Sequence, residues 1–268
     1  MTAMLVDSHC HLDFPEFAAD LDGVVARAGE AGVGMMLTIG THLSKWQGVR
    51  AVAERFANVY CTVGVHPHEA GTEGQGDAAR LIALASTDAK VIGIGETGLD
   101  FYYDKSPRDA QATSFRSHIA AARELGLPLV VHARDADAEC AAILHEEYAK
   151  GAFTGVMHCF SSGRQLAEAA LEIGFFISLS GIATFKGAAD LQAIVPDIPA
   201  DRLLVETDAP FLAPVPLRGK RNEPAFVAHT AATVAKLRGV EVAALAAQTT
   251  DNFFRLFTRA DRGLLAAT

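Results

Sequence analysis

The stretch Val6-Asp7-Ser8-His9-Cys10-His11 ends the first apolar run of this 268-residue chain and places two histidines one residue apart. Side chains alternate faces along a β-strand, so His9 and His11 are predicted to point the same way, about 7 Å apart along the chain. Such a pair can grip a metal ion, although a single His-x-His pair is weak evidence. Its meaning depends on what stands at the ends of the other apolar runs.

Strand-like apolar runs alternate with helix-like segments along the chain. Eight strands are predicted, over residues 4–9, 33–39, 59–65, 91–96, 128–132, 154–158, 175–179 and 203–207. Helix-like segments include residues 43–56, 107–126, 136–149, 161–173, 224–238 and 241–257. Eight alternating β and α units are typical of a (β/α)8 TIM barrel, predicted here as a single α/β domain over residues 1–268.

Four further potential ligands stand at or just past the ends of these strands. They are Glu96, His132, His158 and Asp208. In a (β/α)8 barrel the C-terminal ends of the strands meet at one mouth, where the active site is built. A doubly wound open sheet would not gather five strand ends around one point. The ligand pattern itself therefore favours a closed barrel.

The six candidate ligands are four imidazoles and two carboxylates, without a cysteine. They are His9, His11, Glu96, His132, His158 and Asp208. This set suits Mg²⁺, Mn²⁺ or Zn²⁺ and does not choose among them. Six ligands exceed the needs of one open catalytic ion, so two ions bridged by Glu96 are predicted. His9, His11 and Asp208 are assigned to one ion, and His132 and His158 to the other. Two ions about 4 Å apart suit hydrolysis of a phosphodiester.

Two carboxylates carry predicted chemical roles. Glu96 ends a strand that is otherwise apolar, so its carboxylate is expected to be buried. It must then be paired or metal-bound, because an unpaired buried charge is very costly. Asp208 is expected to ligate a metal and to take a proton from the attacking water. Glu206, two residues earlier on the same face, is expected to hydrogen-bond to a ligand or a nearby hydroxyl.

Residues beyond the third and fifth strands are candidates for contact with substrate. His66 is expected to contact substrate or donate a proton, as a catalytic and substrate-binding residue. His68 follows Pro67, which breaks the strand, and is expected to be a loop residue. Arg134 is expected to bind a phosphate oxygen or to form a supporting salt bridge.

Composition limits the partners and the compartment. The formal net charge of −9 argues against a broad basic surface that coats duplex nucleic acid, but not against a pocket that takes strand ends. No apolar run reaches the roughly 18–20 residues of a membrane span, and the N-terminus lacks the pattern of a signal peptide. The cysteines, Cys10, Cys61, Cys140 and Cys159, lack a CxxC spacing and predict reduced thiols in the cytoplasm. A monomer is favoured.

Motifs along nearly the whole chain resemble the TatD family of metal-dependent deoxyribonucleases, within the metallo-dependent hydrolase superfamily. They are Asp7-Ser8-His9-Cys10-His11, Gly64-Val65-His66-Pro67-His68, Gly95-Glu96-Thr97-Gly98-Leu99-Asp100, Pro128-Leu129-Val130-Val131-His132-Ala133-Arg134, His158-Cys159-Phe160-Ser161, Glu206-Thr207-Asp208-Ala209-Pro210-Phe211-Leu212-Ala213-Pro214 and Asn252-Phe253. The resemblance implies a (β/α)8 barrel and Mg²⁺-dependent hydrolysis of DNA, often from the 3′ end of single strands or ends. It also implies the same six metal ligands.

The chain departs from the family pattern at positions that are not ligands. Phe101 stands where a Tyr is usual, Ser162 where a Gly is usual, and His118 where a Gln is frequent. These departures bear on substrate contacts. Aromatic residues such as Phe101, Tyr102 and Phe185 could stack on bases or serve packing.

Two other functions are alternatives to the nuclease. The first is hydrolysis of an ester or amide, such as aminoacyl-tRNA deacylation or the activity of a small-molecule amidohydrolase. Many superfamily relatives bridge their metals with a modified lysine on the fourth strand, but here that strand ends in Glu96 and Lys90 precedes it. The second is a non-catalytic barrel that holds metal for structure, which an open site with spare acid–base groups disfavours.

Overall fold

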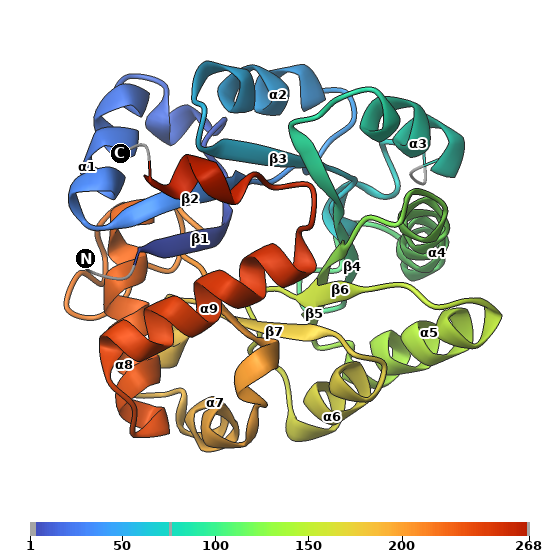
Figure 1. The fold of residues 1–268 in the computed structure, drawn as a ribbon. Helices are drawn as coiled ribbons and strands as arrows, with labels where there is room; N and C mark the ends of the chain where they lie inside the picture. The colour runs from blue at the N-terminus through green and yellow to red at the C-terminus, as the bar shows by residue number, and fades with distance from the viewer. Residues whose placement is uncertain (1–3, 75–76, 267–268) are drawn as a thin grey trace.

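The computed structural model describes residues 4–74 and 77–266, and within them eight parallel strands follow one another in sequence order around one sheet (Figure 1). The strands are β1 (Leu5–Cys10), β2 (Val33–Thr38), β3 (Val59–Val63), β4 (Val91–Asp100), β5 (Leu129–Arg134), β6 (Gly155–Met157), β7 (Phe176–Leu179) and β8 (Leu203–Val205). All eight predicted strands are present. The predicted (β/α)8 barrel is therefore confirmed.

The barrel closes just beyond β8, at the level of the candidate ligands. Cys10 and Ala209 form a parallel bridge, the Asp208 amide donates to the His9 carbonyl at 2.9 Å, and the His11 amide donates to the Ala209 carbonyl at 2.8 Å. The backbone bonds that join the first and last strands thus fix His9, His11 and Asp208 relative to one another.

Helices surround the barrel in alternation with the strands (Figure 1). They are α1 (Leu21–Glu30), α2 (Trp46–Arg55), α3 (Ala78–Ser86), α4 (Arg108–Leu125), α5 (Asp137–Lys150), α6 (Arg164–Glu172), α7 (Ala189–Ile194), α8 (Val227–Arg238) and α9 (Val242–Leu256). The predicted start and end signals of α4 hold, since Pro107 precedes it and Gly126 ends it in the left-handed conformation. Within the described residues, no helix has the length and apolar character that a bilayer crossing requires.

One apolar cluster closes the barrel at the end opposite the candidate ligands. It combines residues near the starts of the strands, such as Tyr60 of β3 and Ile92 of β4, with Phe253, Leu256 and Phe257 in and just after α9. In Figure 1 α9 runs across this end of the barrel. Because α9 seals one end, access to the barrel interior is left to the C-terminal mouth.

Strand β4 is longer than the sequence pattern predicted. The expected end at Glu96 was wrong, because the strand pairs with β5 as far as Asp100. Gly98 makes this continuation possible: its φ is +133°, and a Cβ there would lie 2.0 Å from the His132 carbonyl oxygen. Strand β4 therefore brings a second carboxylate, Asp100, to the mouth.

A buried histidine on α4 fixes the segment before His66. His118 Nε2 accepts a hydrogen bond from the Val65 amide at 2.9 Å, and its Nδ1 donates to the Ser114 carbonyl at 2.7 Å. Both ring nitrogens are thereby used by a neutral imidazole. Burial lowers the pKa of His118 to about 4.

This neutral histidine predicts a specific loss of stability in acid. His118 binds a proton more tightly in the unfolded chain, where its pKa has the ordinary value of 6.5, than in the folded protein. Protonation therefore favours unfolding: the contribution of His118 to the free energy of unfolding is fully present above pH 6.5 and decreases as the pH drops towards 4. From pH 7.5 to pH 5 the loss should be about 2 kcal/mol. His118→Gln, whose amide oxygen can still accept from Val65, should lose about 2 kcal/mol less over this range in urea unfolding. Equal losses in both proteins would contradict the assignment.

Candidate metal centre

The structure brings all six predicted ligands together at the mouth of the barrel. His9 lies near the end of β1 and His11 just beyond it, while Glu96 and His132 lie within β4 and β5. His158 directly follows β6, and Asp208 lies three residues past β8. Their side chains are buried or nearly so, and Asp208 is the most open of the β1 and β8 group at 14% exposure.

The first group of donor atoms forms on the β1 and β8 side. His9 Nε2 and His11 Nε2 are 3.3 Å apart, and His11 Nε2 is 3.2 Å from Asp208 Oδ1. His9 Nε2 is 3.6 Å from the same Asp208 oxygen and 3.5 Å from Glu96 Oε2. His9 Nε2 therefore lies within 3.6 Å of three other donor atoms, which belong to His11, Glu96 and Asp208.

The second group forms around the other oxygen of Glu96. Glu96 Oε1 is 2.8 Å from His158 Nε2, 3.1 Å from His132 Nδ1 and 3.3 Å from His66 Nε2. His132 Nδ1 and His158 Nε2 are 3.3 Å apart. The two carboxylate oxygens of Glu96 thus face two different clusters, which is the arrangement expected of a bridging ligand.

The spacing of these atoms fits coordination of divalent ions. Bonds of about 2.1 Å imply ligand-to-ligand distances of about 3.0 Å in an octahedron and 3.4 Å in a tetrahedron. The contacts within the two groups run from 2.8 to 3.6 Å. The donor chemistry also fits, since imidazole nitrogens and carboxylate oxygens are ligands for Zn²⁺ and Mn²⁺, and carboxylates for Mg²⁺.

Hydrogen bonds from His158 and His132 to carboxylates outside the donor groups leave, on each ring, the nitrogen that faces Glu96 free to bind a cation. His158 Nδ1 is 3.2 Å from Glu206 Oε1, and His132 Nε2 is 3.1 Å from Asp100 Oδ2. Each of these nitrogens donates its proton to the carboxylate, so in the neutral rings, the form that binds a metal, the lone pairs lie on His158 Nε2 and His132 Nδ1. Glu206 also accepts from the Cys159 amide at 2.8 Å, which holds the carboxylate in place.

His66 differs from these rings although it lies equally close to Glu96. Its Nδ1 accepts a hydrogen bond from the His68 amide at 3.1 Å, so the proton of the neutral ring sits on Nε2. Burial lowers the pKa of His66 to about 4, which keeps the ring neutral at physiological pH. His66 Nε2 is therefore a hydrogen-bond donor that points into the site.

The electrostatics of the cluster favour anionic carboxylates. Burial opposes ionisation of Glu96, but the positive charge and hydrogen bonds that His158 and His132 supply when protonated outweigh it and hold the pKa of Glu96 well below its usual range. Burial likewise opposes ionisation of Asp208, and the hydrogen bond with His11 lowers its pKa below the ordinary value. Both carboxylates are available as anionic ligands at neutral pH.

Sequence reasoning missed Asp100 and undervalued His68. Asp100 Oδ2 accepts from His68 Nε2 at 2.8 Å as well as from His132, so His68 is not an ordinary loop residue. The signal was present in the sequence, since Glu96, Gly98 and Asp100 share one face of a continuous strand. The error came from ending the strand at Glu96.

Asp100 supports a testable expectation about metal affinity. Asp100→Asn removes the charge that orients His132, and loss of such a supporting carboxylate typically weakens metal affinity about 10- to 100-fold. Competition with a chromophoric chelator would measure it, with Asp104→Asn, an exposed neighbour, as the matched control. Unchanged affinity in Asp100→Asn would show that His132 needs no such support.

Arg134, predicted to bind a phosphate oxygen or to form a supporting salt bridge, lies beside two tyrosine rings. Its guanidinium carbon lies 4.1 Å from the ring centroid of Tyr102 and 4.8 Å from that of Tyr103, on the exposed rim of the mouth.

The cysteines next to the histidines turn elsewhere, because Cys10 Sγ donates to the Leu37 carbonyl and Cys159 Sγ contacts Ser180 Oγ. Neither thiol joins a donor group.

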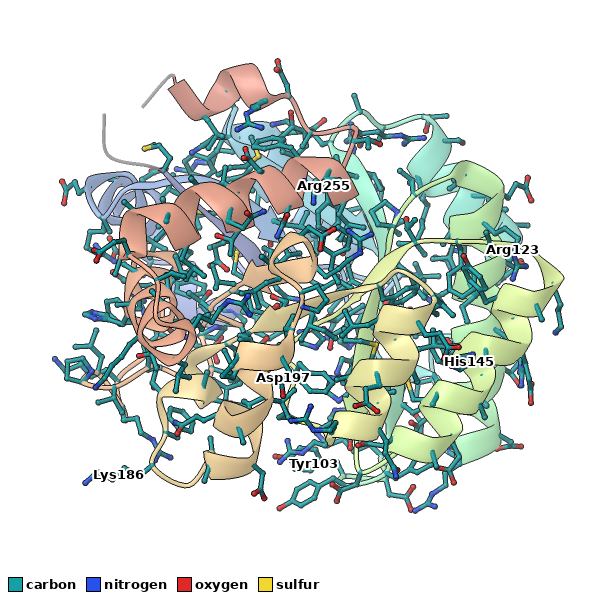
Figure 2. The ribbon with its side chains drawn as sticks, turned by 60° about the horizontal axis from the view of Figure 1, so that its bottom comes forward. Tyr103, Arg123, His145, Lys186, Asp197 and Arg255 are labelled. Carbon is teal, nitrogen blue, oxygen red and sulfur yellow. The ribbon has the colours of Figure 1, made fainter. Side chains whose placement is uncertain are left out.

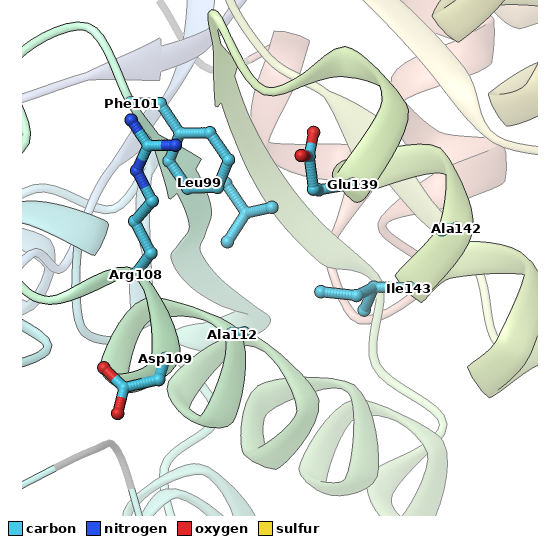
Figure 3. Close-up of a pocket in the computed structure, with 8 residues that line it drawn as sticks. All are labelled: Leu99, Phe101, Arg108, Asp109, Ala112, Glu139, Ala142 and Ile143. Atoms are coloured by element: carbon cyan, nitrogen blue, oxygen red, sulfur yellow. The ribbon is translucent and has the colours of Figure 1, made fainter.

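A separate hollow of about 360 Å³ lies outside the barrel, between α4 and α5 (Figure 3). Its lining residues are Leu99, Phe101, Arg108, Asp109, Ala112, Glu139, Ala142 and Ile143. Leu99 and Phe101 follow the outward face of β4, opposite to Glu96 and Asp100. Phe101, which the sequence suggested as a base-stacking residue, therefore packs away from the donor groups.

A (β/α)8 barrel whose mouth gathers imidazoles around a shared carboxylate defines the class of metal-dependent hydrolases. The model of one family, described as TatD related DNase, matches residues 6–258, and the chain belongs to this family. The resemblance seen in the sequence is therefore confirmed.

Individual relatives match over nearly their full length. A protein of Escherichia coli K12 described as the uncharacterized metal-dependent hydrolase YcfH is 45% identical over 256 residues, which cover 94% of this chain and 95% of that protein. The 3′-5′ ssDNA/RNA exonuclease TatD of Klebsiella pneumoniae is 38% identical, with 94% and 97% covered. The crystal structure of the TatD homologue YjjV from Escherichia coli superposes with a TM-score of 0.89 at 29% identity, covering 96% and 99%.

Proposed function

We propose that this protein is a two-metal nuclease that hydrolyses phosphodiester bonds in single-stranded DNA or at DNA ends, from the 3′ end. The observation that carries the proposal is the position of Glu96, whose two oxygens face two separate groups of donor atoms. Divalent ions held there would polarise a phosphoryl oxygen and make the attacking water more acidic. The exonuclease name of one relative supports the choice of substrate class.

The ligand roles follow the two groups of donor atoms. His9, His11 and Asp208 would hold one ion, His132 and His158 the other, and Glu96 both. The expected metal from the family is Mg²⁺, but four imidazole nitrogens suit Mn²⁺ or Zn²⁺ at least as well. Activity should therefore be compared with each of the three ions after complete removal of metal.

Two side chains are placed to serve the reaction itself. Asp208 is anionic, and it is the more exposed of the two carboxylates, so it can accept the proton that the attacking water loses. His66 presents a protonated Nε2 to the same space, so it can donate a hydrogen bond to a phosphate oxygen. Arg134 would contact substrate from the rim.

The first experiment is cleavage of 5′-labelled single-stranded DNA with Mg²⁺, Mn²⁺ or Zn²⁺ and with chelator. A ladder that shortens from the 3′ end and vanishes with chelator is the expected result. An intact oligonucleotide in the presence of bound metal would contradict the proposal and direct attention to RNA and to the ester bond of aminoacyl-tRNA. We further propose that the protein acts in the cytoplasm, which its free cysteines support, and that it acts as a monomer.

A further inference from the structure

Exposed aromatic side chains flank the metal centre on the β4 and β5 side. Tyr102 and Tyr103 lie just beyond the end of β4, after Phe101, and are 57% and 50% exposed, with their ring centroids 4.9 Å apart. The Tyr103 ring meets the His68 ring edge-on, with 5.3 Å between the ring centroids. His68 in turn donates a hydrogen bond to Asp100, so the tyrosine lies next to the donor groups. We call Tyr102, Tyr103 and Arg134 the tyrosine shelf.

Two cationic side chains lie over the rings of the tyrosine shelf. The Arg134 guanidinium lies over both tyrosine rings, and Lys105 Nζ is 5.4 Å from the centroid of Tyr103. Figure 2 shows Tyr103 at the opposite end of the molecule from Arg255 of α9, so the shelf stands at the open end of the barrel. Rings with adjacent cations match a nucleotide, whose base stacks while its phosphate pairs with the charge.

A second group of rings flanks the centre on the β1 and β8 side. Phe14 stacks on His11 with 4.7 Å between ring centroids, and Phe211 meets Phe14 edge-on at 5.9 Å. Phe211 is 48% exposed, and its amide donates to the Asp208 carbonyl at 2.9 Å, which ties it to the proposed site. We call Phe14 and Phe211 the phenylalanine shelf.

The strand order puts the two shelves on opposite sides of the mouth. The strands run from β1 to β8 in sequence and β8 closes onto β1, so the β8/β1 junction lies across the barrel from the β4/β5 pair. The tyrosine shelf follows β4 and β5, and the phenylalanine shelf follows β1 and β8. Glu96 and the two donor groups lie between them.

We propose that the two shelves bind the two bases on either side of the scissile phosphate. This inference rests on the proposed function and deepens it, because it makes a single strand with bases on both sides of the bond the substrate. A duplex keeps its bases stacked on one another, whereas unpaired bases can be taken up by separate rings. Hydrolysis would then depend on the bases and not only on the phosphodiester.

The test needs no mutation at first. Wild-type protein is given 5′-labelled oligonucleotides that lack either the 3′-terminal base or the next base, each replaced by a tetrahydrofuran residue. Each replacement should lower kcat/KM about 5- to 150-fold, the range for loss of one stacked base. Equal cleavage of all three oligonucleotides would overturn the proposal. Failure of wild-type protein to cleave any oligonucleotide would instead overturn the proposed function.

Variants then assign the bases to the shelves. Tyr103→Leu and Phe211→Leu should each lower kcat/KM for the full oligonucleotide. On the oligonucleotide that lacks the base bound by the substituted shelf, the same substitution should lower kcat/KM little further. Fluorescence anisotropy of labelled oligonucleotide, measured in Asp208→Asn background, should show the same coupling in binding. Tyr148→Leu, an exposed tyrosine on α5 that packs on Phe153, is the control. Losses that add independently of the missing base would overturn the proposal.

Discussion

Glu96→Gln is expected to lower kcat/KM for DNA at least about 10³-fold, which corresponds to about 4 kcal/mol of transition-state stabilisation. Glu96 is the one residue in this arrangement whose oxygens contact both donor groups, with Oε2 3.5 Å from His9 and Oε1 2.8 Å from His158. The amide of Gln keeps the size of the side chain but loses the charge and one oxygen. Both proposed ions should therefore bind more weakly.

Metal content separates this explanation from a general loss of structure. After dialysis against buffered metal, Glu96→Gln should retain less metal per chain than the wild type, as measured by mass spectrometry, while its circular dichroism spectrum is unchanged. Glu139→Gln carries the same substitution on α5, in the outer hollow, and should keep both metal and activity. Full metal occupancy with full activity in Glu96→Gln would refute the bridging role.

Asp208→Asn is expected to lower kcat about 10²- to 10⁴-fold at saturating metal, the usual contribution of a general base. Asp208 adopts a φ of +56°, a left-handed conformation that Asn tolerates better than most residues, so the variant isolates the charge from the backbone. Because the pKa of Asp208 is lowered and only the anion accepts a proton, wild-type activity should fall as the pH drops through that value. The variant should lack this acidic limb.

The matched control for this variant is Asp190→Asn, an exposed position in the first turn of α7. Its kcat and pH profile should equal those of the wild type. If Asp208→Asn kept more than about a tenth of the wild-type kcat, another group would have to accept the proton.

Much of the site could be predicted because its residues are marked by local position. His9, Glu96, His132 and His158 each stand at or near the end of an apolar run, and the end of a strand is a property of the local pattern. Once eight such runs alternate with helices, closure of the barrel brings those ends together. The family motifs cover the same positions.

The boundaries of the site depended on contacts that no local pattern contains. Asp100 joined the site because β4 pairs with β5 beyond Glu96, which the glycines of β4 allow and which a run of apolar residues does not reveal. The same pairing places Arg134 beside Tyr102 and Tyr103, a stacking contact that the sequence pattern did not predict.

By itself the sequence determined the class of fold, the six converging ligand candidates and the family, because strand periodicity and motif spacing are written along the chain. Only the tertiary structure decided which ring nitrogen of His66, His132 and His158 faces the site with a proton or a lone pair. His132 and His158 are fixed by carboxylates from other strands, whereas His66 is fixed by its own loop. A tautomer depends on hydrogen-bond partners brought together by the closure of the barrel, and such partners lie far apart in the sequence.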